Sequence, residues 1–164
     1  MRNTLLTITG TILVPSILHI FLPFLILQAT SVTSFPSIGF IEVGSILLAL
    51  FGISMVIWVS ITFVRHGKGT AVPFYPPTEF VALGLYRFVR NPMYVGIFLV
   101  IIAESIFFRS VWLLVYGAFL WLPVQIYVMR VEEPQLESRF GASYRNYRTT
   151  TPRWIPRIHR QSGA

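Results

Sequence analysis

The chain has 164 residues, of which 54% are hydrophobic and only 12% are charged. Soluble domains carry about 25% charged residues, so this composition places the chain among membrane proteins. Cysteine is absent, which excludes disulfides, thiolate nucleophiles and cysteine-based metal sites. The net charge of +7 is concentrated in segments that flank apolar runs, a pattern typical of membrane topology rather than of nucleic-acid binding.

Four long apolar segments predict four transmembrane helices within a single integral membrane domain covering residues 1–164. The predicted spans are 5–27, 38–64, 93–108 and 111–129. The first is longer than the ~7–15-residue apolar region of a signal peptide, so we expect a retained helix. Only Arg109 and Ser110 separate the last two spans, which predicts a tight helical hairpin. The expected fold class is therefore all-α, a polytopic membrane helical bundle.

Charge predicts the orientation of these spans. The linker 29–37 carries no charge, whereas the loop 65–91 and the tail from Arg130 are rich in arginine. By the positive-inside rule, the loop, the tail and both termini face the cytoplasm, in a multi-pass protein of the cell membrane. Arg109 lies at the opposite end of its spans and is expected to snorkel to the outer headgroups.

The tail itself has a helical pattern. Four bulky side chains recur at helical spacing: Leu136, Phe140, Tyr144 and Tyr147. This periodicity predicts a C-terminal amphipathic helix lying against the cytoplasmic face of the membrane. Trp154 follows it between two prolines, where its amphipathic ring suits the headgroup level.

Polar residues are densest just before the third span, in a segment covering residues 80–96. Asn91 can cap a helix, and Pro92 suits the first turn because its missing N–H would be unpaired there anyway. The plain interpretation is therefore a well-capped membrane helix with anchoring side chains. The alternative is a binding site.

A second polar segment, 130–156, follows the fourth span and opens with Glu132 and Glu133. The macrodipole favours cations at a helix C-terminus, so local stability does not explain two carboxylates there. A bound cation or an arginine such as Arg90 would explain them. Alternatively, the two glutamates are simply exposed to solvent within a basic tail. Because the last two spans form a hairpin, both polar segments are expected on one face. A site between them suits a polar cofactor meeting a lipophilic substrate.

Several short motifs follow one another between Phe80 and Pro156: Gly84-Leu85-Tyr86, Arg90-Asn91-Pro92-Met93-Tyr94-Val95-Gly96, Glu132-Glu133-Pro134-Gln135-Leu136, Phe140-Gly141-Ala142-Ser143-Tyr144-Arg145-Asn146-Tyr147 and Pro152-Arg153. In this order and spacing they resemble the isoprenylcysteine carboxyl methyltransferase and phospholipid methyltransferase superfamily of integral membrane enzymes. The resemblance covers nearly half of the chain. Asn91 departs from it, since the prenylcysteine enzymes have histidine there, and an amide cannot act as a general base.

The resemblance implies S-adenosyl-L-methionine (S-adenosylmethionine) as methyl donor. It implies a lipophilic acceptor, either the carboxylate of a prenylcysteine-like compound or a lipid amine. The cofactor-binding residues that it implies are Gly84, Tyr86, Arg90, Asn91, Pro92, Tyr94, Glu132 and Glu133. Of these we expect Arg90 and Glu133 to be catalytic: Arg90 holds the cofactor carboxylate or orients an anionic acceptor, and Glu133 binds the cofactor hydroxyl or ammonium groups. No metal site is predicted.

Two other functions stay open on the sequence. A membrane reductase could use NADPH on a similar helical scaffold, because fold does not fix reaction. A non-enzymatic scaffold or transport component would bind no cofactor, although such a protein would not need polar side chains concentrated at one hairpin base.

Some polar and ionisable side chains lie within the predicted spans. Glu104 is expected near the outer interface with Arg109 close by, although an ionisable group in a span is often functional. His19 and Gln125 are interpreted as hydrogen-bonding partners between helices. Three glycines in or near the second span suggest close helix packing and a homodimer face: Gly39, Gly44 and Gly52.

Overall fold

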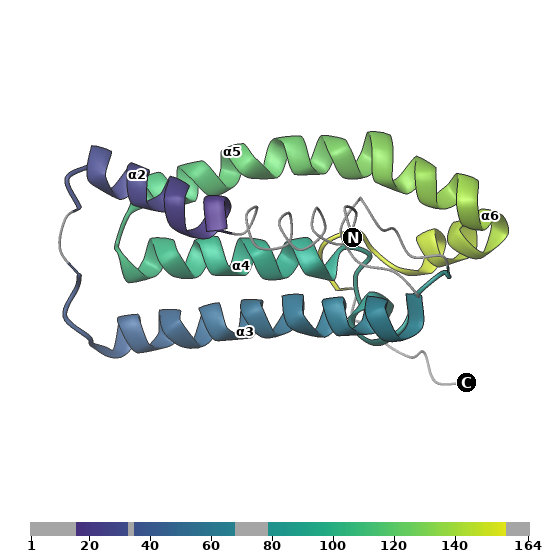
Figure 1. The fold of residues 1–164 in the computed structure, drawn as a ribbon, viewed down its shortest axis with the longest axis horizontal. Coiled ribbons are helices and arrows are strands. Elements are labelled where there is room, and N and C mark those ends of the chain that lie inside the picture. Colours follow the sequence, from purple (N-terminus) through teal and green to yellow (C-terminus); the bar gives the residue numbers. More distant parts are fainter. Residues whose placement is uncertain (1–15, 33–34, 68–78, 157–164) are drawn as a thin grey trace, which may run out of the picture.

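The computed structural model describes residues 16–32, 35–67 and 79–156, and within these ranges every regular element is a helix (Figure 1). The predicted all-α class is therefore confirmed for the described residues. The elements in chain order are η1 (Ile17–Phe21), α2 (Leu22–Ala29), α3 (Phe40–Thr62), η2 (Phe63–Gly67), η3 (Gly84–Arg87), α4 (Pro92–Phe107), α5 (Val111–Tyr127), η4 (Val128–Glu132) and α6 (Glu133–Thr150).

Two helices of the described part are long and apolar enough to cross a membrane, namely α3 and the continuous helix Val111–Thr150. The helices Ile17–Ala29 and Pro92–Phe107 are apolar but shorter. Large hydrophobic side chains point outward along α3 and α5, with Phe40 fully exposed and Phe119 70% exposed. Apolar surface of this extent indicates association with a membrane. Four spans remain a prediction, and residues 5–15 of the first lie outside the described residues.

The helix α4 lies between α3 and α5 (Figure 1). It approaches α3 at a pair of glycines. A Cβ placed on Gly52 would lie 2.6 Å from the carbonyl oxygen of Gly96, and one placed on Gly96 would lie 2.7 Å from that of Gly52. Gly52 thus serves packing within the chain. Gly44, by contrast, has no described atom within 4 Å of its Cβ position, so it is open to a neighbour.

The predicted hairpin between α4 and α5 is confirmed, and Arg109 forms its turn with a left-handed backbone at φ 50°. The Arg109 guanidinium donates to Glu42 at the start of α3, over 2.6 Å. The other Glu42 oxygen accepts from the backbone N–H of Gly39 at 2.9 Å. The sequence suggested that Arg109 reaches toward the headgroups. In the structure Arg109 links the hairpin to α3 through the buried Glu42 carboxylate.

The helix α5 continues without a break through η4 into α6, which bends at Gly141, a residue with φ 54° and ψ −124°. The rings of Phe140, Tyr144 and Tyr147 all contact Phe80, with centroids 5.3–6.1 Å apart. Three of the four side chains that the spacing grouped therefore pack within the protein, against Phe80, and contact of this helix with the membrane face stays a prediction. After α6 the chain turns back toward the beginning of α4 (Figure 1).

Substitution of the crossing glycines tests this packing. Gly96→Ala forces the two backbones apart, because the clashing atom is a carbonyl oxygen, and should lower the free energy of unfolding by about 1–3 kcal/mol. Gly44→Ala is the matched control and should be neutral or stabilising, since alanine is the better helix former. The measurement is detergent-induced unfolding followed by circular dichroism. Equal stability of the two variants would contradict the close crossing.

Candidate active site

The residues at the start of α4 are fixed by the chain that follows α6. The backbone N–H of Arg90 donates to the carbonyl of Pro152 at 2.8 Å. Asn91 occupies the N-cap position, but its side-chain amide donates to the carbonyl of Arg153 at 3.3 Å rather than capping the helix, so the predicted capping role was wrong. Pro92 opens α4 and is buried. The two segments that the sequence placed on one face are thus in direct contact.

Glu133 is the centre of this contact. Its Oε1 accepts from Arg90 at 2.8 Å, and Arg153 forms a two-bond fork with Oε1 and Oε2, each at 2.8 Å. The Glu133 side chain is 9% exposed and that of Arg90 11%. The hydrogen bonds that Arg153 donates to Glu133 raise the pKa of the Arg153 guanidinium. An arginine partner, one of the explanations offered by the sequence, therefore accounts for this carboxylate.

The ion cluster has a net positive charge, because two guanidinium groups share one carboxylate. Arg90 Nε is buried and has no hydrogen-bond partner of good geometry among the described residues, although the guanidinium also interacts with the buried Tyr144 hydroxyl. A buried donor without a partner is costly, so it marks a position where a ligand oxygen would be stabilised.

Glu132 lies beside this cluster and has a different environment. Its Oε2 accepts from the Tyr94 hydroxyl at 3.2 Å. Burial raises the pKa of the Glu132 carboxyl, although the hydrogen bond from Tyr94 acts in the opposite direction. Glu132 therefore holds a proton to higher pH than an exposed glutamate would, which suits a group that binds hydroxyls or exchanges protons.

Two more tyrosines, Tyr86 and Tyr147, lie close to these charged groups. Burial raises the pKa of Tyr86 well above its usual range and also raises that of Tyr147. Both phenols therefore stay protonated at neutral pH. Tyr147 donates to the carbonyl of Tyr86 at 2.7 Å, which links α6 to η3. The Tyr86 ring packs edge-on against Phe63, with centroids 5.5 Å apart.

Gly84 has a conformational role. Its φ of +58° is rarely adopted by residues with a side chain, and a Cβ there would lie 2.9 Å from Nε1 of Trp58 on α3. Only glycine fits this turn without strain. Gly84 therefore determines the backbone direction in which η3, the element that carries Tyr86, begins. All the predicted site residues thus gather at one end of α4, with Gly84 and Pro92 shaping the backbone.

Sequence reasoning missed Arg153 as a site residue, although the closing Pro-Arg motif contained it. It also missed Trp154, whose indole N–H donates to Gln125 at 2.7 Å and whose ring lies 6.3 Å from that of Tyr94. Gln125 therefore binds the segment after α6 rather than a neighbouring helix. Within residues 16–32, 35–67 and 79–156 there is no group of three or more metal-ligating side chains.

Comparisons with known proteins bear on this site. The model of a family described as phospholipid methyltransferase matches residues 40–143. The chain is also similar to a methanethiol S-methyltransferase of Crocosphaera subtropica (strain ATCC 51142 / BH68), with 34% identity over 88 residues. That match covers 54% of this chain and 33% of the relative, so the chain spans about a third of the length of that protein.

Removal of the shared carboxylate tests the ion cluster. Glu133→Ala leaves two guanidinium groups facing each other in a partly buried place and should cost about 3–5 kcal/mol of unfolding free energy. Glu137→Ala is the control: it removes a more exposed carboxylate that pairs with Arg148 at 3.0 Å, and should cost about 0–1 kcal/mol. Unfolding in detergent gives both values. Similar losses in the two variants would contradict the central position of Glu133.

Proposed function

The chain belongs to the phospholipid methyltransferase family, and we propose that it transfers a methyl group from S-adenosylmethionine to a lipophilic acceptor at the membrane. The observation that carries this proposal is the meeting of the α4 start with the α5–α6 junction. At this place Arg90, Tyr94, Glu132 and Arg153, the last from the segment after α6, lie together beside helices whose outer faces are apolar.

The donor groups present fit this cofactor. The unpartnered Nε of Arg90 suits its carboxylate, and Glu132 suits its ribose hydroxyls or its ammonium group. Both oxygens of Glu133 are already engaged by arginines. We therefore assign Glu133 to holding Arg90 in position, rather than to direct contact with the cofactor.

S-adenosylmethionine, when bound, supplies a methyl group on a sulfonium that an electron-rich acceptor attacks in line. The residues of the chain then have to align the two and keep water out, and alignment alone can contribute roughly 7–11 kcal/mol. The net positive charge of the ion cluster attracts an anionic acceptor. Tyr94 and Trp154 close one side of the site with aromatic surface.

Acceptors differ in whether they need a base. A carboxylate is ready to attack, whereas a protonated amine or a thiol must first lose a proton. Glu132 is the group on which such a proton would arrive, because its raised pKa makes it a better base than an exposed glutamate. The acceptors to compare are a prenylcysteine-like carboxylate, a lipid amine and, from the name of the similar protein, methanethiol.

Binding experiments test the cofactor proposal. Calorimetry on the detergent-purified chain should show that S-adenosylmethionine and S-adenosylhomocysteine bind and that NADPH does not. Glu132→Gln or Tyr94→Phe should weaken binding tenfold or more, about 1.4 kcal/mol, while Glu137→Gln should not change it. Binding of NADPH alone, of none of the three, or equally by all the variants would contradict the proposal.

We further propose four spans with both termini and the site in the cytoplasm. Because the chain has no cysteine, single cysteines report topology directly. In intact cells a membrane-impermeant maleimide should label Ser37→Cys, and it should label Ser138→Cys only after permeabilisation. If only α3 and α5 crossed the membrane, positions 37 and 138 would be labelled from the same side, which would overturn the four-span topology.

A further inference from the structure

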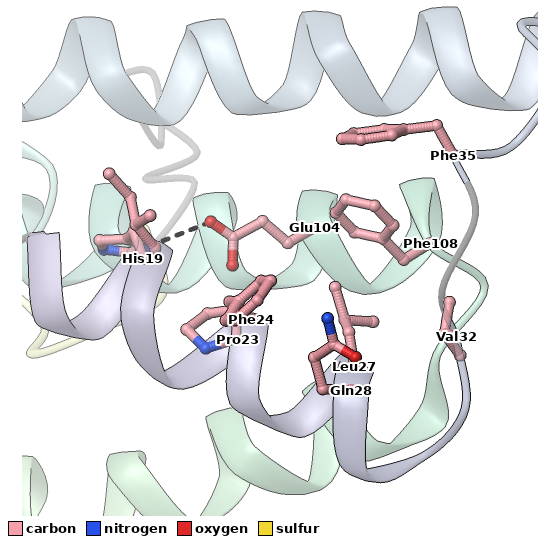
Figure 2. Close-up of a pocket in the computed structure, with 10 residues that line it drawn as sticks. His19, Pro23, Phe24, Leu27, Gln28, Val32, Phe35, Glu104 and Phe108 are labelled. Carbon is pink, nitrogen blue, oxygen red and sulfur yellow. Dashed lines mark ion pairs between the residues drawn. The ribbon is translucent and has the colours of Figure 1, made fainter.

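A second polar pair lies far from the candidate active site. His19 of η1 and Glu104 of α4 approach to 3.6 Å between Nδ1 and Oε1, and each side chain is 17% exposed (Figure 2). Within the described part of the chain, neither His19 Nδ1 nor Glu104 Oε2 has a hydrogen-bond partner, and both atoms are buried. Glu104 is thus paired with His19, while Arg109, its expected neighbour, binds Glu42.

This pair faces a pocket of about 310 Å³. Its walls come from η1 and α2, from Val32 and Phe35, and from the C-terminal end of α4. Most of the lining is apolar, including Phe24, Phe35 and Phe108, and Gln28 adds an amide (Figure 2). A concave apolar site with a few polar groups is the usual form of a small-molecule site, for which volumes of roughly 300–1,000 Å³ are typical.

The pocket is separate from the site proposed for methyl transfer. Glu104 lies more than three helical turns along α4 from Asn91, which corresponds to about 20 Å at 1.5 Å per residue. Methyl transfer requires reacting atoms roughly 3–3.5 Å apart, so a molecule held at Glu104 cannot receive the methyl group. The inference therefore goes beyond the proposed function and does not depend on it.

We propose that this pocket binds a small amphiphile with an ammonium head group and a short alkyl body. The head group donates to the buried Glu104 oxygen that has no donor, and the alkyl body contacts the aromatic walls. A carboxylate inside an apolar helix bundle is costly, and such groups commonly mark binding sites. The same carboxylate repels fatty acids and gives an alcohol of equal length a weaker hydrogen bond.

Photolabelling of the full chain in lipid nanodiscs tests this assignment. The probes are diazirine derivatives of octylamine, octanol and octanoate. The amine should label peptides covering residues 16–32 and 104–108 saturably, at least tenfold more strongly than either of the other probes. Glu104→Gln should reduce labelling by the amine to the level of the alcohol, whereas Glu137→Gln, on α6, should leave it unchanged.

A second variant covers the case in which Glu104→Gln does not fold. His19→Gln keeps the carboxylate and removes its imidazole partner, so labelling by the amine should be retained or should increase. Equal labelling by the three probes would show a groove for acyl chains only and would overturn the proposal. Labelling that maps elsewhere, or that persists undiminished in folded Glu104→Gln, would overturn it as well.

Discussion

Three charged side chains from separate parts of the sequence share one partly buried place at the start of α4. Charges in apolar surroundings are stable only when they are paired and hydrogen-bonded, so Arg90, Glu133 and Arg153 stabilise the fold only together. Arg90 precedes α4, Glu133 begins α6 and Arg153 follows α6. Their pairing therefore fixes how the hairpin base closes, and the positions of Tyr94, Glu132 and Trp154 depend on it.

The other end of the bundle is held by the same kind of interaction. Buried Glu42 joins Arg109 of the α4–α5 turn to the first turn of α3. Between the two ends, Gly52 and Gly96 allow α3 and α4 to approach closely. The helix α4 is thus held at both ends and at its centre, which makes it a rigid element for both polar sites along it. Such support is what precise positioning of reacting groups requires.

The elements that sequence analysis predicted best are those with a local signal. Apolar run length predicted α3, α4 and α5 to within a few residues, and helical spacing predicted the packed face of α6. The tight hairpin at Arg109 and Ser110 predicted that the two polar segments would lie on one face. The continuity of α5 into α6 was missed, since charge after Met129 suggested a separate helix although the backbone continues.

Most contacts between distant residues were not predictable in this way, because pairing across the fold leaves no periodic pattern. Arg90 as a possible partner of the two glutamates was the exception. Nothing in the sequence distinguishes Glu42 as the partner of Arg109, or Arg153 as the second partner of Glu133. Asn91 shows the limit of local rules. It occupies the N-cap position, but its side-chain amide donates to the carbonyl of Arg153, in the segment after α6, instead of capping the helix.

The comparisons support a membrane methyltransferase, and the geometry indicates which side chains such an enzyme would use here. Arg90 and Glu133 are expected to act as one unit that closes the site. A double-mutant cycle with Arg90→Met, Glu133→Gln and the combined variant measures this directly through unfolding free energies. We predict a coupling within the 0.5–3 kcal/mol seen for contacting residues, about 1.5 kcal/mol or more. Additive losses, with no coupling, would show that the two segments do not meet and would contradict the account.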